Sequence, residues 1–224
     1  MKLINIYKQL LKESELNQRF DRVGDFINGF ARVKLNDKWN FINLEGKLLS
    51  DIWFDSVYNI NKFGFAQVEL NYQWNFINLE GKLLSNIWFD FVSTFNQFGL
   101  AKVRLNDKYN LINKEGKLLS NIWFDYIYCF NDDDDLAKVA LNNKENYINL
   151  EGKLISDIWF DNIGYFNEFG LVEVGLNNKY NILKKEGKLV FNKWLDNSFI
   201  GVIRFVSKNG LMIKYDNNYK VIKI

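Results

Sequence analysis

The sequence contains no histidine, no proline and a single cysteine, Cys129. Without histidine, the chain lacks the side chain that most often moves protons near neutral pH and most often binds metals. One cysteine excludes a disulfide within the chain and is consistent with a reducing compartment. Without proline, the turns must depend on Gly, Asn and Asp.

An excess of one charge is also lacking, because 29 basic residues face 27 acidic ones and the net charge is +2. Such a balance provides no bulk attraction to nucleic acid or to anionic lipid. No stretch approaches the roughly 18 apolar residues of a membrane span, and the first twenty residues lack the apolar core of a secretory signal. We therefore expect a cytoplasmic protein with neither nucleic-acid nor membrane partners.

What the chain does contain is a repeated segment. The thirteen residues "NLEGKLLSDIWFD" at 43–55 return with few changes at 78–90, 113–125 and 149–161. A catalytic motif is needed once, whereas a structural unit recurs and stacks on its neighbours. The spacing of about 35 residues is marked by one aspartate per unit: Asp21, Asp55, Asp90, Asp125, Asp161 and Asp196. A degenerate copy from Gly201 onward makes six units.

Within each unit the pattern is that of short strands. "FARVKL" at 30–35 alternates apolar and polar residues, which is typical of a half-buried strand. Asn36-Asp37 predicts a tight turn into a second strand, "KWNFIN". The segment "KLLSDIW" at 47–53 and the one after it are expected to be extended as well. The sequence therefore predicts an all-β fold with three or four strands per unit.

These residues carry a resemblance to a known family. "DKWNFINLEGK" at 37–47, "YQWNFINLEGK" at 72–82 and "DKYNLINKEGK" at 107–117 resemble the bacterial WG-type β repeats. Glu145 departs from the family pattern at the Trp position, and the glycine after Trp is replaced by Asn40, Asn75, Asn110 and Asn181. The resemblance implies an intracellular all-β repeat protein and brings no catalytic residues.

The expected domain organisation is one repeat domain over residues 20–224 behind a helical cap at residues 1–19. Apolar residues spaced for one helix face over residues 2–16 predict that helix. Six small units favour a six-bladed β-propeller. The decayed last unit and the helix at the other end suit the alternative, an open β-solenoid or superhelical array, which needs capped ends.

Two recurring residue types are interpreted as structural. The six aspartates at the unit boundaries are expected to accept backbone N–H bonds in their own turns rather than to line an opening as ligands. One tryptophan per unit is expected to be a wedge between packed copies rather than a stacking platform. These tryptophans are Trp53, Trp88, Trp123, Trp159 and Trp194.

The candidate binding residues lie where the units vary. One strand position reads Trp39, Trp74, Tyr109, Glu145 and Tyr180, and this variation predicts partial exposure. If aromatic residues form a binding surface, Trp39, Trp74, Tyr109 and Tyr180 are the candidates. The second candidate is an acidic insertion, interpreted as a solvated loop that suits a basic partner rather than as a cation site. It consists of Asp132, Asp133, Asp134 and Asp135.

No nucleophile–base pair, phosphate-binding glycine loop or metal-ligand spacing is present. We therefore expect a protein that is not an enzyme and uses neither cofactor nor metal. The leading hypothesis is a non-catalytic scaffold that presents a rigid β surface to a protein partner. The alternative is a module that binds carbohydrate or another small ligand through its exposed aromatic residues.

Overall fold

The computed structural model describes residues 15–128, 135–196, 203–207, 210–215 and 218–222, and the side chains of 15–128 and 135–196. The chain divides into two compact units, residues 1–122 and 123–224. The prediction of a single repeat domain over residues 20–224 stays a prediction. In the described part of the chain, no helix has the length and apolar character needed to cross a membrane.

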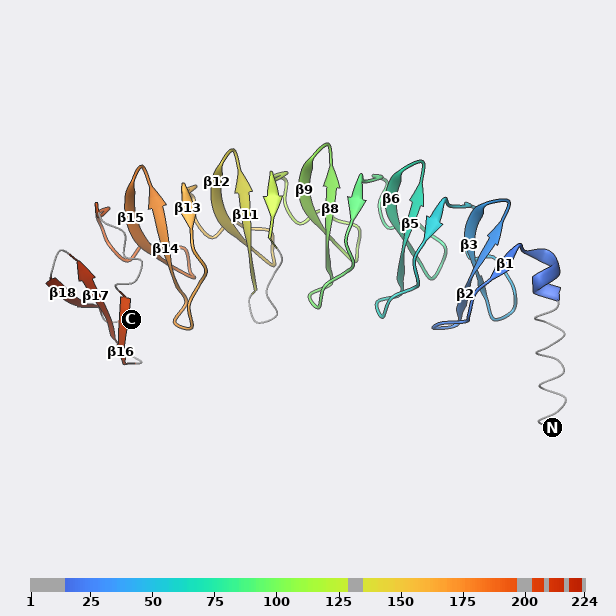
Figure 1. Cartoon of the computed structure of the whole chain (residues 1–224), viewed down its shortest axis with the longest axis horizontal. Coiled ribbons are helices and arrows are strands. Elements are labelled where there is room, and N and C mark those ends of the chain that lie inside the picture. The colour runs from blue at the N-terminus through green and yellow to red at the C-terminus, as the bar shows by residue number, and fades with distance from the viewer. Residues whose placement is uncertain (1–14, 129–134, 197–202, 208–209, 216–217, 223–224) are drawn as a thin grey trace. The chain divides into compact units, whose positions relative to one another are not determined.

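Each unit consists of three-stranded antiparallel sheets, and every sheet is built from three strands consecutive in sequence (Figure 1). The all-β prediction is therefore confirmed. The first unit contains β1 (Arg22–Val23), β2 (Phe30–Leu35), β3 (Lys38–Asn43), β4 (Ser56–Val57), β5 (Phe65–Leu70), β6 (Gln73–Asn78), β7 (Phe91–Val92), β8 (Leu100–Leu105) and β9 (Lys108–Asn113).

The second unit repeats this arrangement with three further sheets, in the orders β10-β11-β12, β13-β14-β15 and β16-β17-β18. Its strands are β10 (Tyr126–Ile127), β11 (Leu136–Leu141), β12 (Lys144–Asn149), β13 (Asn162–Ile163), β14 (Leu171–Leu176), β15 (Lys179–Lys184), β16 (Ile203–Ser207), β17 (Gly210–Tyr215) and β18 (Asn218–Ile222).

A tight two-residue turn joins the second and third strands of the first five sheets. Asn36 and Asp37 both have positive φ, 49° and 62°, which is the backbone of a type I′ hairpin turn. Asparagine and aspartate tolerate this conformation, so the turn prediction is confirmed. Of the three or four strands predicted per repeat, the sheets have three, because residues 47–53 form only the single bridge between Leu48 and Ile42.

Within each unit, successive sheets are joined by a short segment, and between the first two sheets it hydrogen-bonds to both. The Trp39 N–H donates to the Phe54 carbonyl at 2.7 Å, and the Phe54 N–H donates back to the Trp39 carbonyl at 2.9 Å. One residue later, the Asp55 N–H donates to the Glu69 carbonyl of the next sheet at 2.8 Å. Backbone hydrogen bonding therefore continues without interruption from the first sheet into the second.

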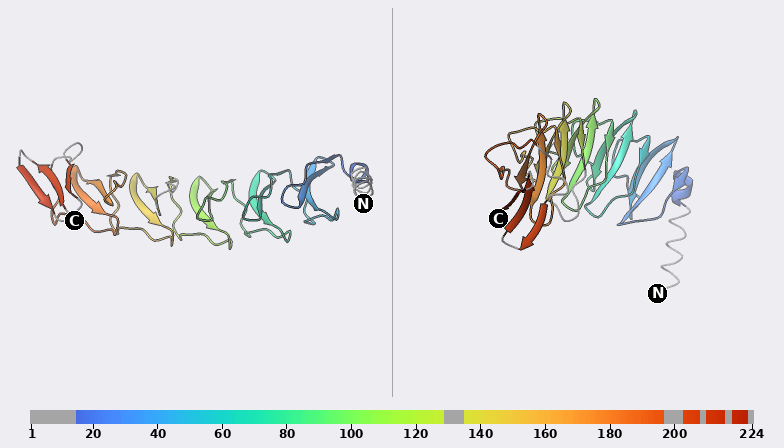
Figure 2. Two further views of the ribbon diagram at one scale, coloured as in Figure 1. Left: turned by 90° about the horizontal axis from the view of Figure 1, so that it is seen from below. Right: turned by 60° about the vertical axis from the view of Figure 1, so that its left-hand side comes forward.

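The core lies between successive sheets. Phe41 of the first sheet packs in one buried cluster with Val57, Val68 and Ile77 of the second, and Trp88 covers this cluster. In both views of Figure 2 the sheets of the first unit lie side by side, as this packing requires. The interpretation of Trp88 as a wedge between adjoining copies is confirmed. In the second unit Trp194 likewise packs against a buried cluster that contains Tyr147 and Val174, from two successive sheets.

Helical residues cover part of the first sheet. Residues 15–19 are helical, and Leu16 and Phe20 are buried against Ala31, Val33 and Ile42. Arg19 also donates from Nη1 to the Gly46 carbonyl at 2.9 Å. The cap predicted over residues 1–19 stays a prediction, and residues 1–14 lie outside the described residues.

Candidate binding surface

Where the next sheet belongs to the same compact unit, the variable strand position lies at the margin between two successive sheets. Each of its five residues is half-buried: Trp39, Trp74, Tyr109, Glu145 and Tyr180. We call this margin a rim. The first rim lies between the sheets β1–β3 and β4–β6, the second between β4–β6 and β7–β9, and the Glu145 rim between β10–β12 and β13–β15.

One polar side chain crosses each of these rims and donates to the backbone of the next sheet. Arg32 Nη1 donates to the Val57 carbonyl at 3.4 Å. Gln67 Nε2 bonds the Val92 carbonyl at 2.9 Å, and Lys138 Nζ bonds the Ile163 carbonyl at 2.8 Å. The donor and the acceptor lie 25 residues apart in all three cases. Three different residue types therefore make the same contact between copies.

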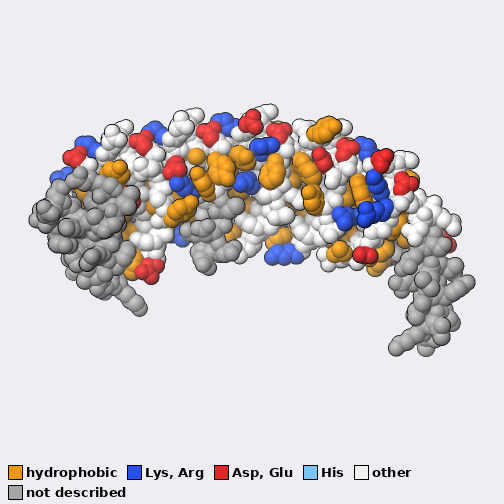
Figure 3. All heavy atoms as spheres, in the orientation of Figure 1, with side chains coloured by type: hydrophobic (Ala, Val, Ile, Leu, Met, Phe, Trp, Pro, Cys, Tyr) orange, Lys and Arg blue, Asp and Glu red, His pale blue; other side chains and the backbone are white. Residues whose placement is uncertain are grey.

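The first rim is basic. Three cationic groups lie near the centre of the Trp39 ring, those of Arg22 at 6.0 Å and of Arg32 and Lys34 at 5.9 Å. Figure 3 shows basic side chains flanking a hydrophobic one over the first two sheets. Lys34 forms a 2.8 Å ion pair with Asp37 and, by hydrogen bonding, lowers the pKa of that carboxyl.

The second rim is aromatic, and Gln67 and Glu69 occupy the positions of Arg32 and Lys34 in it. The Tyr58 and Trp74 rings lie 5.7 Å apart and are tilted by 40°. Tyr58 is 53% exposed. The sequence analysis missed Tyr58, because the equivalent position holds Ser93 in the next repeat and Gly164 in the fifth.

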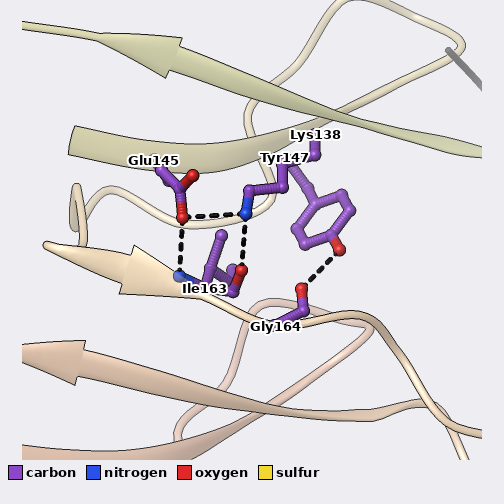
Figure 4. Close-up of polar contacts among 5 residues, drawn as sticks. All are labelled: Lys138, Glu145, Tyr147, Ile163 and Gly164. Carbon is purple, nitrogen blue, oxygen red and sulfur yellow. Dashed lines mark hydrogen bonds and ion pairs between the residues drawn. The ribbon is translucent and has the colours of Figure 1, made fainter. Parts of the chain in front are cut away.

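The Glu145 rim carries a carboxylate where the other repeats have an aromatic ring. Glu145 Oε2 lies 2.9 Å from Lys138 Nζ and accepts the Ile163 N–H at 2.9 Å (Figure 4). The Tyr147 hydroxyl also donates to the Gly164 carbonyl at 2.7 Å. The carboxylate is thus held by one cation and one backbone N–H of the next sheet.

The remaining predicted site residues do not share one pocket. Tyr109 lies under the Lys102 ammonium, 5.6 Å from its ring centre, and Tyr180 packs against a buried cluster that contains Leu171 and Ile182. The four aromatic candidates occupy equivalent positions in separate repeats, so the prediction of partial exposure is confirmed for all of them. Their role in binding stays a prediction.

The acidic insertion is described only at its end, because Asp132, Asp133 and Asp134 lie outside the described residues. Asp135 is exposed and forms a 2.7 Å ion pair with Lys185. The hydrogen bond from Lys185 lowers the pKa of the Asp135 carboxyl. Among the residues that the structure describes, no group of three or more His, Cys, Asp or Glu side chains is arranged to hold a metal ion.

Five of the six aspartates that recur once per repeat accept backbone N–H groups, as predicted, but not in their own turns. Asp55 Oδ2 accepts the Asn71 N–H at 2.7 Å, from the hairpin turn 16 residues later. The same bond, at 2.6–2.8 Å, is made by Asp21, Asp90, Asp125 and Asp161. The expectation of a bond within their own turns was wrong. The donor lies instead in the turn between the second and third strands of the sheet that begins just after the aspartate.

A second repeated residue was missed as a structural element. Asn40 is fully buried, and its Nδ2 donates to the carbonyls of Ser50 at 2.8 Å and Ile52 at 3.1 Å. Its Oδ1 accepts the Phe41 N–H at 2.8 Å. Equivalent bonds are made by Asn75, Asn110, Asn146 and Asn181. The sequence signal was an asparagine in each of the first five repeats at the position where the family pattern has glycine.

The sequence matches the model of the WG containing repeat five times, at residues 19–39, 41–74, 76–109, 111–144 and 147–180. These matches cover more than half of the chain, which therefore belongs to the WG-repeat family. They confirm the resemblance on which the repeat prediction depends. None of the proteins of curated function matches this sequence.

Three solved structures illustrate the structural similarities. A Bacteroides caccae protein of unknown function is 16% identical, with 78% of this chain and 80% of that one covered and a TM-score of 0.28. Hsv2 of Kluyveromyces marxianus is 11% identical over 87% and 76%, with a TM-score of 0.37. Kluyveromyces lactis Hsv2 is 9% identical over 90% and 79%, with a TM-score of 0.35. Similarities at this level carry no functional argument.

Proposed function

We propose that this protein is a non-catalytic scaffold that binds a partner protein along its rims. The observation that carries the proposal is the contrast between two sets of repeated positions. The boundary aspartates and the buried asparagines are bonded within the fold. The aromatic position at the rims, by contrast, is half-exposed in every copy that has it and varies between copies.

The second rim has the composition of a protein-binding patch. Tyr58 and Trp74 present adjacent aromatic surface that is already ordered by the strands beneath it. Tyrosine and tryptophan dominate binding energies at protein interfaces, since they bury a large area and lose little conformational entropy. An aromatic residue at the Trp74 position in four of the five repeats suits an extended partner that contacts several copies.

A capture experiment with a matched control tests this proposal. The full chain and its Tyr58→Ala/Trp74→Ala variant are immobilised, and proteins retained from the native cell extract are identified by mass spectrometry after cross-linking. The control is Tyr72→Ala, because Tyr72 is 91% exposed and lies in the hairpin turn between β5 and β6. We expect the rim variant alone to lose the partner. Capture of the same partner protein by the Tyr58→Ala/Trp74→Ala variant would refute the proposal.

The second candidate function is carbohydrate binding, favoured by the partly exposed indoles of Trp39 and Trp74 at equivalent positions. Indole faces stack on sugar rings, and equal positions in successive repeats suit a ligand that itself repeats. A glycan array and a tryptophan-fluorescence titration test this function. Binding of a glycan that Trp39→Ala and Trp74→Ala each weaken would replace the protein-partner proposal.

We also propose that β16–β18 is a sixth copy of the repeat and that the protein is cytoplasmic. The gapless match of residues 170–190 with 201–221 and the three-stranded sheet β16-β17-β18 support the sixth copy. Closure into a six-bladed propeller, with the open array as its alternative, stays a prediction. A closed compact particle of this length has a radius of gyration of about 17 Å, and a clearly larger value in X-ray scattering would favour the open array.

A further inference from the structure

The Glu145 rim reveals what kind of group a rim can hold. Its carboxylate is bonded by the Lys138 ammonium and the Ile163 N–H, each at 2.9 Å. The Lys138 and Glu145 side chains are only 11% and 21% exposed, so this rim is filled by the chain itself. The carboxylate therefore has one charged and one backbone donor.

The first rim offers the same two donors without an internal carboxylate. Arg32 takes the place of Lys138, since both cross to the carbonyl 25 residues later. Tyr58 N–H donates to the Gln67 carbonyl, so the neighbouring pair of Val57 and Val68 is of the non-hydrogen-bonded type. The Val57 N–H therefore points away from β5, and it has no acceptor among the described residues.

Charge also distinguishes the first rim from the other two. Arg22, Arg32 and Lys34 surround Trp39, whereas the second rim has Gln67 and Glu69 at the positions of Arg32 and Lys34. Asp37 is paired with Lys34. Within the described residues, neither Arg22 nor Arg32 forms an ion pair. An anion at this rim would therefore meet two guanidinium groups that no carboxylate neutralises.

We propose that the first rim binds an acidic segment of the partner protein, with one of its carboxylates held by Arg32 and the Val57 N–H. This inference rests on the proposed scaffold function and names the chemistry of its partner. The bound carboxylate takes the part that the Glu145 carboxylate plays in its own rim. The Trp39 ring supplies an apolar wall, and Arg22 and Lys34 attract further acidic residues of the segment.

The probe is a fluorescein-labelled peptide, Gly-Ser-Glu-Glu-Phe-Glu-Ser-Gly, titrated with the full chain and followed by fluorescence anisotropy at low salt. A second peptide has Gln in place of all three Glu residues. We expect the acidic peptide to bind at least about tenfold more tightly than the Gln peptide, because charged hydrogen bonds are stronger than neutral ones. Added salt weakens the binding. Equal affinities for the two peptides would overturn the proposal.

Two variants of the first rim test the site itself. Arg32→Gln keeps a donor that reaches the Val57 carbonyl, as Gln67 does in the next repeat, and removes the charge. We expect it to weaken binding about tenfold or more. Trp39→Glu supplies an internal carboxylate like Glu145 and is expected to abolish peptide binding. Unchanged melting temperatures relative to wild type show that both variants remain folded.

The control variant is Lys47→Gln, which removes the same charge from an exposed side chain outside the rim. If Lys47→Gln and Arg32→Gln weakened binding of the acidic peptide equally, the peptide would be attracted by the overall charge of the protein, and the proposal would be overturned. Tighter binding of an RNA oligonucleotide or of phosphatidylserine vesicles, lost in Arg32→Gln, would also overturn it. Loss of the captured partner in the Tyr58→Ala/Trp74→Ala variant, without any acidic-peptide binding, would leave the scaffold function standing and refute this inference alone.

Discussion

Replacement of Gly81 by alanine tests how closely successive repeats pack. Gly81 has φ of 76°, a conformation that costs an alanine about 1–2 kcal/mol. A Cβ at this position would lie 1.8 Å from the Leu49 carbonyl oxygen of the preceding repeat. Because that oxygen belongs to the backbone, the two copies must move apart to admit the methyl group.

Gly46 provides the matched control. It has nearly the same φ, 79°, but its position faces the helical cap, and an added Cβ would only meet Leu16 Cδ2 at 3.4 Å. Gly46→Ala should therefore cost only the backbone strain of about 1–2 kcal/mol. Gly81→Ala adds an overpacking penalty of about 1–3 kcal/mol, for a total of roughly 2–5 kcal/mol.

The assay is guanidinium unfolding of the full chain, followed by tryptophan fluorescence and by circular dichroism. In a repeat protein the stability is a sum of the intrinsic terms of the repeats and of the interfaces between them. We expect Gly81→Ala to be less stable than Gly46→Ala by the overpacking penalty. Equal losses of stability for the two variants would refute the close packing of Gly81 on the preceding repeat.

Three further perturbations have expected outcomes. Asn75→Asp removes the amide group that donates to the Ser85 and Ile87 carbonyls. It should lower the free energy of unfolding in urea by at least about 3 kcal/mol, and a decrease below about 1 kcal/mol would contradict the structural role of these two hydrogen bonds. The Lys144 hydrogen bond lowers the pKa of Asp161 below its ordinary 3.8, so the stability from this pair is present above about pH 4 and lost as the pH falls through the lowered pKa. The melting temperature of Asp161→Asn should therefore fall less on acidification than that of wild type. Equal falls in melting temperature for the two proteins would argue against the Lys144–Asp161 pair. Lys138→Met leaves the Glu145 carboxylate without its cation and should lower the free energy of unfolding by about 2 kcal/mol. The second substitution Glu145→Tyr in the same chain should restore that stability, and a double variant no more stable than Lys138→Met would contradict the ion pair.

The sheets were predictable because their signals are local. Alternation over residues 30–35 and the Asn36-Asp37 turn depend only on residues next to one another, and the structure has strands and a type I′ turn there. The repeat itself predicted that one tryptophan per unit lies between copies, because a residue that packs on its neighbour must recur with it.

The rims were not predictable to the same extent, since their contacts join residues of different type in different copies. Arg32, Gln67 and Lys138 make one and the same bond, and no shared residue identity marks it. The acceptor role of Asp55 was predictable from its chemistry. Its donor, 16 residues later, depends on how one sheet leads into the next, which local patterns do not reveal.

The central claim is that the repeats of each unit form one continuously bonded stack. Hydrogen exchange measured by mass spectrometry tests it most directly, because the linking residues Phe54 and Asp55 donate to two different sheets. We predict that peptides covering residues 50–60 and 85–95 exchange as slowly as those covering the strands at 30–43. Linkers that exchange orders of magnitude faster than the strands would mean independent sheets on a flexible chain and would contradict the account.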